Sequence, residues 1–145
     1  MARHTYACPL RWSDMDAYGH VNNVNFLRYL EDARVDFMFT RAENAGVPGF
    51  SSGTVIARHE IDYLRPLVYR PAPVTVEIWV TGIRPAAFTV AYEVKDVAED
   101  GGETLYVRAS SVLVPYHLED ARPRRLTPEE RAYLEPYLDG AAVAA

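Results

Sequence analysis

The apolar positions in residues 22–44 recur with the period of an α-helix. They stand three or four residues apart, as on one face of a helix, at Phe26, Leu30, Ala33 and Phe37. Charged side chains fall largely off this face. Asn22 or Asn23 is suited to cap the start, and Gly46 followed by Pro48 is suited to end it. The pattern predicts one long helix with a single buried face.

Elsewhere the period changes to two residues, which is typical of β-strands with one buried face. The strands we expect cover residues 4–12, 55–63, 74–81, 88–94 and 104–116. The sequence Ala-Glu-Asp-Gly-Gly before the last strand is a hairpin signal. In the second strand, alternation predicts one half-buried face made of Val55, Ala57, His59, Ile61 and Tyr63.

Near the end of the chain, Thr127-Pro128-Glu129-Glu130 has the form of a capping box with proline in the first helical position. We expect a short helix from there to about Tyr137, and a frayed alanine-rich tail at 140–145. One long helix and five largely antiparallel strands make a two-layer α+β domain, which we expect to span residues 1–139. Sheet edges are usually covered or paired, so we expect a homo-oligomer.

Composition limits the class of protein further. A chain of 145 residues with 49% hydrophobic and 24% charged residues is one globular domain. No apolar run approaches the ~20 residues of a membrane helix, and the first residues lack the apolar core of a signal peptide. A net charge of -5 argues against general nucleic-acid binding. The single cysteine, Cys8, excludes an internal disulfide and fits a reducing cytoplasm, where we expect the protein to reside.

Residues 14–23, between the first strand and the helix, carry more polar and ionisable side chains than a simple connection needs. They include two carboxylates, an imidazole, a phenol, two amides and a glycine. The N–H groups at a helix start lack acceptors, so they stabilise a carbonyl oxygen that becomes negative when the carbonyl is attacked. A carboxylate a few residues earlier, such as Asp16, is placed to attack that carbonyl or to deprotonate a water. The segment predicts acyl transfer or hydrolysis without a Ser or Cys nucleophile.

Each residue of this segment also has an ordinary structural interpretation. Asp14 is typical of a turn in which the side chain bonds its own backbone. Asp16 is equally typical of a cap, and His20 of a packed histidine. Asn22 and Asn23 are typical of helix capping alone. These alternatives stay open from the residues alone, and the concentration of all five in one segment favours a functional site.

The run from Arg11 to Arg34 resembles the opening motif of hotdog-fold acyl-CoA thioesterases, in particular the 4-hydroxybenzoyl-CoA thioesterase-like group. Its centre is Asp14-Met15-Asp16-Ala17-Tyr18-Gly19-His20-Val21-Asn22-Asn23. The later run Ile61-Asp62-Tyr63-Leu64-Arg65-Pro66 is similar to the exit of the family's second strand. The resemblance covers about residues 5–116. It implies a hotdog fold, in which a curled sheet wraps one long helix, and thioester hydrolysis as the activity.

The resemblance assigns roles to three residues. The second aspartate of the family motif falls on Asp16, which is thereby the nucleophile or general base. The helix-start position whose N–H polarises the thioester carbonyl falls on Asn23, where bacterial members often have Tyr or His. The stretch Gly-His-Val-Asn-Asn is similar to plant-type acyl-carrier-protein thioesterases, whose catalytic histidine falls on His20. Those enzymes have Asn in place of Tyr18 and a downstream Cys that this chain lacks. The carrier, coenzyme A or acyl-carrier protein, therefore stays open.

The resemblance also implies substrate-binding residues, for which we take Tyr18, Asn22, His59, Tyr63 and Arg65. Packing is the alternative for Tyr63, and a core or interface position is the alternative for His59. Arginine binds phosphate bidentately, so further candidates for the coenzyme A phosphates are Arg58, Arg70, Arg84 and Arg108. The four histidines lack the spacing of a metal site. We expect no metal, and no cofactor other than coenzyme A as part of the substrate.

The function we expect is hydrolysis of an acyl-CoA to a free acid and coenzyme A, in a homodimer or homotetramer. The acyl pocket then lies between the helix start of one protomer and the strands of its neighbour. Two alternatives stay open: a hotdog hydratase or dehydratase of enoyl thioesters, and a non-catalytic acyl-CoA-binding module. The sequence does not indicate whether the acyl group is aromatic, short or long.

Overall fold

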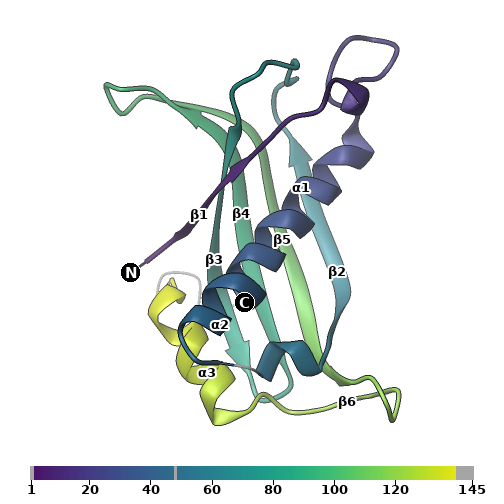
Figure 1. Ribbon diagram of the computed structural model, residues 1–145, viewed down its shortest axis with the longest axis vertical. Helices are drawn as coiled ribbons and strands as arrows, with labels where there is room; N and C mark the ends of the chain where they lie inside the picture. Colours follow the sequence, from purple (N-terminus) through teal and green to yellow (C-terminus); the bar gives the residue numbers. More distant parts are fainter. Residues whose placement is uncertain (1, 48, 140–145) are drawn as a thin grey trace.

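One long helix lies across one face of a curled antiparallel sheet in the computed structural model, which describes residues 2–47 and 49–139 (Figure 1). A short C-terminal helix packs beside the far end of the long helix (Figure 1). This is the expected α+β hotdog architecture, so the predicted fold class is confirmed. Pro48 and the alanine-rich tail at 140–145 lie outside the described residues.

The long helix runs without a break from Asn23 to Asn44. It comprises α1 (Asn23–Val35), a π-helical segment (Asp36–Arg41) and α2 (Ala42–Asn44). The predicted face is confirmed, because the four apolar side chains at positions 26, 30, 33 and 37 are all buried. The π-helical segment was not predicted. Gly46 adopts a φ of 80° just past the helix, a conformation that glycine accepts at a helix C-terminus.

Within the described residues the sheet has six strands, and all of its strand pairings are antiparallel. Its order is β1-β3-β4-β5-β2, and β6 pairs with β5. The bounds are β1 (His4–Cys8), β2 (Thr54–Tyr63), β3 (Val74–Arg84), β4 (Ala87–Val97), β5 (Glu103–His117) and β6 (Arg122–Pro123). All five expected strands are present. The first is shorter than expected because the chain leaves the sheet and forms a 3-10 turn at Trp12–Asp14, and the two-residue β6 was not predicted.

The core lies between α1 and the inner face of the sheet. Alternate residues of the adjacent strands β3 and β4 are buried, as predicted, at Val74, Val76, Ile78, Val80, Phe88, Val90, Tyr92 and Val94. Full burial of one such aliphatic or aromatic side chain stabilises a fold by about 1.5–3 kcal/mol. This contact fixes where α1 lies, with its first turn near the C-terminal end of β2 (Figure 1).

The predicted pattern of β2 is correct in one half and wrong in the other. The inner face holds His59, Ile61 and Tyr63, as predicted, because they pair with buried residues of β5. The ladder then shifts register between Ile56 and Arg58, which leaves Ala57 as a bulge. A bulge reverses the parity of a strand, so the inner side passes from the predicted Val55 to Ile56.

β2 forms one edge of the sheet, and almost all of it is exposed in the single chain rather than half-buried. Large apolar side chains are exposed along it, including Val55, Ile56 and Tyr63. An exposed apolar edge strand is a ready surface for pairing with another strand. The edge therefore has the properties that led us to expect an oligomer.

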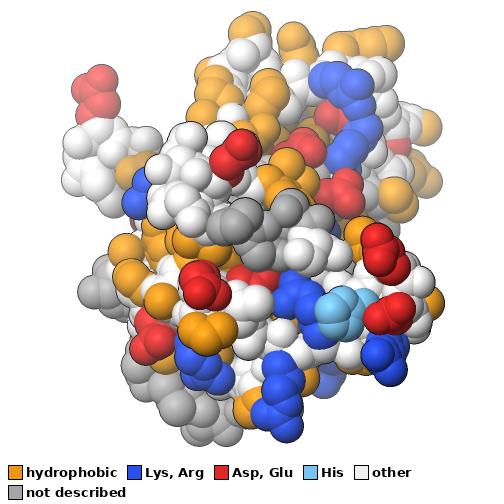
Figure 2. Space-filling view, turned by 60° about the horizontal axis from the view of Figure 1, so that its bottom comes forward, with side chains coloured by type: hydrophobic (Ala, Val, Ile, Leu, Met, Phe, Trp, Pro, Cys, Tyr) orange, Lys and Arg blue, Asp and Glu red, His pale blue; other side chains and the backbone are white. Residues whose placement is uncertain are grey.

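The C-terminal helix α3 (Pro128–Leu134) begins with the capping box that we predicted. The Thr127 hydroxyl accepts the Glu130 N–H (3.1 Å), and the Glu130 carboxylate accepts the Thr127 N–H (2.8 Å). α3 is tied to the π-helical segment, because the Tyr133 hydroxyl donates to the Phe37 carbonyl (2.6 Å). Acidic and basic side chains are interspersed on the face that includes this end of the molecule (Figure 2).

A chain of four polar side chains runs from the buried Arg34 of α1 to His59 on the exposed β2 edge. Arg34 Nη1 donates to the Tyr92 hydroxyl (3.0 Å), and Tyr92 donates to Ser111 Oγ (2.8 Å). Ser111 Oγ lies 2.7 Å from Nδ1 of His59. Since Ser111 already accepts from Tyr92, its own proton is best donated to Nδ1, which favours the neutral His59 tautomer protonated at Nε2. Burial, and after it the positive charge of Arg34, lowers the pKa of His59.

This lowered pKa predicts a specific acid sensitivity. Above the unfolded-state pKa of about 6.5 both states hold neutral His59, whereas at lower pH the unfolded state takes up the proton first. The stability that neutral His59 contributes is therefore lost as the pH falls through 6.5 toward the folded-state pKa. We expect His59→Asn, which keeps an acceptor for Ser111, to show a smaller fall in thermal midpoint between pH 7.5 and 5 than the wild type. His117→Asn, which replaces a histidine outside the polar chain, is the control and is expected to show the same fall as the wild type. Equal falls in the wild type and His59→Asn would contradict the prediction.

Candidate active site

The segment between β1 and α1 forms a closed loop that carries Asp16 back toward the helix start. The Asp16 N–H donates to the His20 carbonyl (2.9 Å), and the Gly19 N–H donates to the Asp16 carbonyl (3.0 Å). Gly19 adopts a φ of 78°, which residues with side chains rarely accept. On either side of the loop, Met15 and Val21 pair as an isolated antiparallel bridge. The local sequence thus folds into a tight loop that fixes the main chain of Asp16.

The Asp16 carboxylate is half-buried, and two groups orient it. Oδ1 accepts the Tyr18 N–H (2.9 Å), an Asx-type contact within the loop. Oδ2 accepts from the Asn22 side-chain amide at 3.5 Å, the outer limit of a hydrogen bond. Oδ2 is therefore the less engaged of the two oxygens and is suited to bind a water or to meet a substrate.

Asn22 is the N-cap of α1. Its side-chain oxygen accepts the Val24 N–H, and its carbonyl accepts the Asn25 N–H, each at 2.9 Å. Asn23 precedes both donors as the first helical residue, so its own N–H has no acceptor within the helix. The cap thus satisfies the next two donors, and the Asn23 N–H is the one left to carry the partial positive charge of the helix start.

A cavity of about 300 Å³ joins the loop, the helix start and the exit of β2. Its lining comprises Asp16, His20, Val21, Asn23, Phe26, Tyr63, Leu64, Arg65 and Pro66. The Tyr63 hydroxyl donates to the Asn23 carbonyl (3.1 Å), and its ring lies 5.9 Å from the Phe26 ring. Burial raises the pKa of Tyr63, which keeps this hydroxyl a donor. The β2 exit is thereby attached to the first turn of α1.

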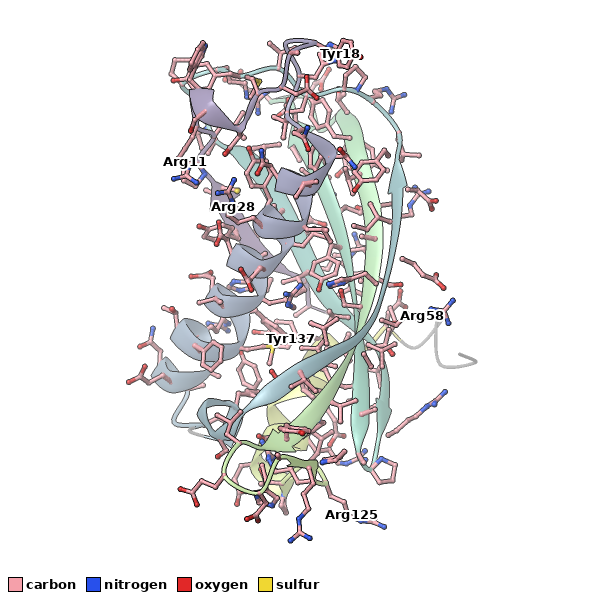
Figure 3. The ribbon with its side chains drawn as sticks, turned by 90° about the vertical axis from the view of Figure 1, so that its right-hand side faces the viewer. Arg11, Tyr18, Arg28, Arg58, Arg125 and Tyr137 are labelled. Atoms are coloured by element: carbon pink, nitrogen blue, oxygen red, sulfur yellow. The ribbon has the colours of Figure 1, made fainter. Side chains whose placement is uncertain are left out.

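Five of the eight predicted site residues line this one cavity: Asp16, His20, Asn23, Tyr63 and Arg65. Asn22 contributes from just outside the lining, through its contact with Asp16. Tyr18 does not join the cavity. Its side chain is 85% exposed and projects at the end of the molecule (Figure 3). His59 does not join it either, because it is held in the polar chain through Ser111.

Sequence reasoning missed two contributions to the site. We assigned Phe26 only to the helix core, yet it also forms a wall of the cavity. We took Asp14 for a turn residue, yet its side chain is buried against α1 and bonds Arg28 and Tyr29. Arg28 and Tyr29 on the adjoining helix could have indicated this role, because their polar groups face the loop and bond Asp14.

The Asp16 carboxylate and the helix start at Asn23 line the same cavity, whose other walls are partly apolar. A carbonyl group bound there has a donor available for its oxygen and a carboxylate available for attack or proton removal. Within residues 2–47 and 49–139, no three His, Cys, Asp or Glu side chains are grouped so as to hold a metal ion. The helices of the same residues include none with the length and apolar character of a membrane span.

Comparison with solved structures finds close matches over nearly the whole chain. A thioesterase from Thermus thermophilus, solved with coenzyme A and Zn, is 30% identical, with a TM-score of 0.71 and coverage of 92% of each chain. A predicted thioesterase from Bacillus stearothermophilus is 23% identical, with a TM-score of 0.77, and the match covers 95% of this chain and 98% of the other. A mutant 4-hydroxybenzoyl CoA thioesterase bound to 4-hydroxybenzoyl CoA is 18% identical, with a TM-score of 0.76 and coverage of 91% and 98%.

Comparison with curated protein sequences finds no match. The family model of the thioesterase-like superfamily matches residues 10–134, which include the loop, α1, the cavity and all the strands except β1. All the residues that line the cavity lie within the part of the chain that the family model matches. The chain belongs to the thioesterase-like superfamily and is a thioester hydrolase.

Proposed function

We propose that the protein hydrolyses acyl-CoA thioesters, with Asp16 as the reacting carboxylate. The observation that carries the proposal is the shared cavity, in which Asp16 and the first helical residue, Asn23, line the same space. Coenzyme A as the carrier is supported by the solved relative from Thermus thermophilus, which is 30% identical and holds coenzyme A. No cofactor takes part in the proposed reaction.

In the proposed reaction, the thioester carbonyl lies between the Asp16 carboxylate and the Asn23 N–H. As the carbonyl carbon is attacked, its oxygen becomes negative, and the N–H with the helix dipole stabilises it. Asp16 either takes a proton from the attacking water or attacks the carbon itself. In both routes the C–S bond breaks and coenzyme A leaves as a thiolate, which takes a proton from Asp16 in the first route and from solvent in the second. The second route passes through an acyl-Asp16 anhydride, which water then hydrolyses to the acid.

His20 and Arg65 have supporting roles in this proposal. His20 lines the cavity close to Asp16 in the chain, so we assign it to orienting the water or assisting proton transfer. Arg65 lines the cavity from the β2 exit, and one of its nitrogens donates to the Leu105 carbonyl (2.9 Å). Its remaining guanidinium donors are suited to a phosphate of coenzyme A. Tyr18 stands exposed beside the loop, where its ring is available to the nucleotide part of the substrate.

We further propose that the working form is a homodimer, or a pair of dimers, joined through the β2 edges. The support is the exposed apolar edge strand. In an antiparallel strand pair around a two-fold axis, the C-terminal end of one strand lies beside the N-terminal end of the other. The cavity at Tyr63 of one protomer then lies beside Thr54 and Ile56 of its neighbour, which enlarges the acyl pocket.

Asp16→Asn tests the proposed chemistry. The amide keeps the shape of the side chain but neither removes a proton nor attacks a carbonyl. We expect kcat for thiol release from acyl-CoAs to fall roughly 10²- to 10⁴-fold, with the fold intact. Asp120→Asn, an exposed aspartate in the turn before β6, is the control and keeps wild-type rates. Near-wild-type hydrolysis by Asp16→Asn would sink the assignment.

The substrate scan also separates the alternative activities. Thiol release measured across aromatic, short and long acyl-CoAs identifies the acyl group, and the same acyl groups on an acyl-carrier protein identify the carrier. A hydratase would convert a 2-enoyl-CoA to the hydroxyacyl-CoA without releasing thiol. A binding module would hold acyl-CoA without turnover.

Asn23→Pro and Asn23→Ala test the oxyanion donor. Proline has no N–H but is favoured at the first helical position, and Asn22 already has the extended backbone that a following proline requires. We expect Asn23→Pro to lower kcat roughly 10²- to 10³-fold while the helix forms. Asn23→Ala keeps the N–H and is expected to stay within about threefold of wild type. Equal activity in the two variants would show that the main-chain donor is not used.

A further inference from the structure

A second carboxylate, Asp14, lies two residues before Asp16 and does not line the cavity. Its side chain is 3% exposed. Burying an ionised carboxylate is costly unless it is paired and hydrogen-bonded, so its partners are held firmly in the folded state. The proposed reaction gives this buried group no chemical role.

The Asp14 carboxylate accepts hydrogen bonds from the first two turns of α1 and from the Arg11 N–H, which donates to Oδ2 (3.3 Å). Oδ1 accepts from Arg28 Nη2 (2.8 Å), and Oδ2 accepts from the Tyr29 hydroxyl (2.7 Å). Arg28 also donates to the Asn25 side-chain oxygen (2.6 Å). Arg11 lies against the same carboxylate, with Nε 3.8 Å from Oδ1, and Arg11 and Arg28 lie close together beside α1 (Figure 3). Burial, and after it the hydrogen bond to Asp14, raises the pKa of Tyr29, so its hydroxyl stays a donor.

The main chain of Asp14 bonds the same helix start. Its carbonyl accepts the Asn22 N–H (3.0 Å) and the Asn25 side-chain amide (2.9 Å). Side chain and carbonyl together hold four residues of the helix start, at positions 22, 25, 28 and 29. We call this set of contacts the Asp14 clamp.

We propose that Asp14 is a positioning residue, whose clamp sets the separation between the Asp16 carboxylate and the Asn23 N–H. Asp14 is two residues from Asp16 along the chain and is bonded to Asn22, the residue directly before Asn23. The clamp therefore joins the two groups between which the thioester carbonyl has to fit. A misplacement of about 1 Å between reacting groups costs up to 10²-fold in rate. This inference rests on the proposed function.

The alternative is that the clamp only stabilises the fold, and a matched pair of tyrosines separates the two. Tyr29 and Tyr133 are both buried, and each donates one hydrogen bond to an oxygen, of Asp14 and of Phe37 respectively. Phenylalanine keeps the ring in either place, including the edge-to-face contact of Tyr29 with Phe26. Tyr133 lies on α3, which packs at the other end of the long helix from the cavity (Figure 1).

The experiment compares kcat, KM and thermal midpoint for Tyr29→Phe, Tyr133→Phe and Asp14→Asn, with acyl-CoA as substrate and Asp16→Asn alongside. We expect both tyrosine variants to lower the thermal midpoint. Tyr29→Phe is expected to lower kcat about tenfold with KM within twofold, whereas Tyr133→Phe keeps kcat within twofold. Asp14→Asn, which loses the charge that Arg28 pairs with, is expected to lose more activity than Tyr29→Phe. If Asp14→Asn does not fold, the tyrosine pair alone decides.

Two outcomes overturn the inference, and they are distinguishable. If Asp16→Asn is inactive while Tyr29→Phe and Tyr133→Phe have the same kcat, the clamp is structural only and the proposed function stands. If Asp16→Asn keeps full activity, the proposed role of Asp16 as the reacting carboxylate fails, and the role of the clamp fails with it.

Discussion

The packing of one apolar helix face against the inner face of the sheet is the contact on which the rest of the structure depends. Because the buried positions of α1 meet the alternate residues of β3 and β4, the helix has one position across the sheet. That position places its first residue, Asn23, beside Tyr63 at the end of β2. A helix start and a strand exit that are 40 residues apart in sequence thereby enclose one cavity. The site is a consequence of the core, rather than an addition to it.

Periodicity was sufficient to predict the elements but not their irregularities. The helix face, the strand order along the chain and the capping box at Thr127 follow from local spacing, which the final structure keeps. The bulge at Ala57 and the π-helical segment Asp36–Arg41 do not follow from local spacing. Each depends on how a whole layer packs rather than on neighbouring residues. The edge position of β2 likewise depends on the order of strands in the sheet, which alternation within one strand does not encode.

The residues that line the candidate cavity were predictable where they lie in one segment of the chain. Asp16, His20 and Asn23 stand within eight residues, so their proximity follows from the chain itself. Tyr63 and Arg65 came from the family resemblance, since no local pattern connects them with the loop. His59 and Tyr18 do not line the cavity, His59 because it is bonded to Ser111 on another strand and Tyr18 because its side chain faces solvent from the loop. Asp14 was missed because its burial depends on α1 packing over it.

The far wall of the cavity is anchored on an irregularity of the sheet. The register of β4 with β5 shifts so that Tyr106 falls between the partners of Val94 and Lys95, and the Tyr106 carbonyl accepts the N–H groups of Leu64 (2.8 Å) and Arg65 (3.2 Å). A bulge leaves its extra residue unpaired in the ladder and bends the strand locally. The position of this wall is therefore set by the pairing of β4 with β5, so a substitution that removes the bulge would move Leu64 and Arg65 without changing any residue that lines the cavity.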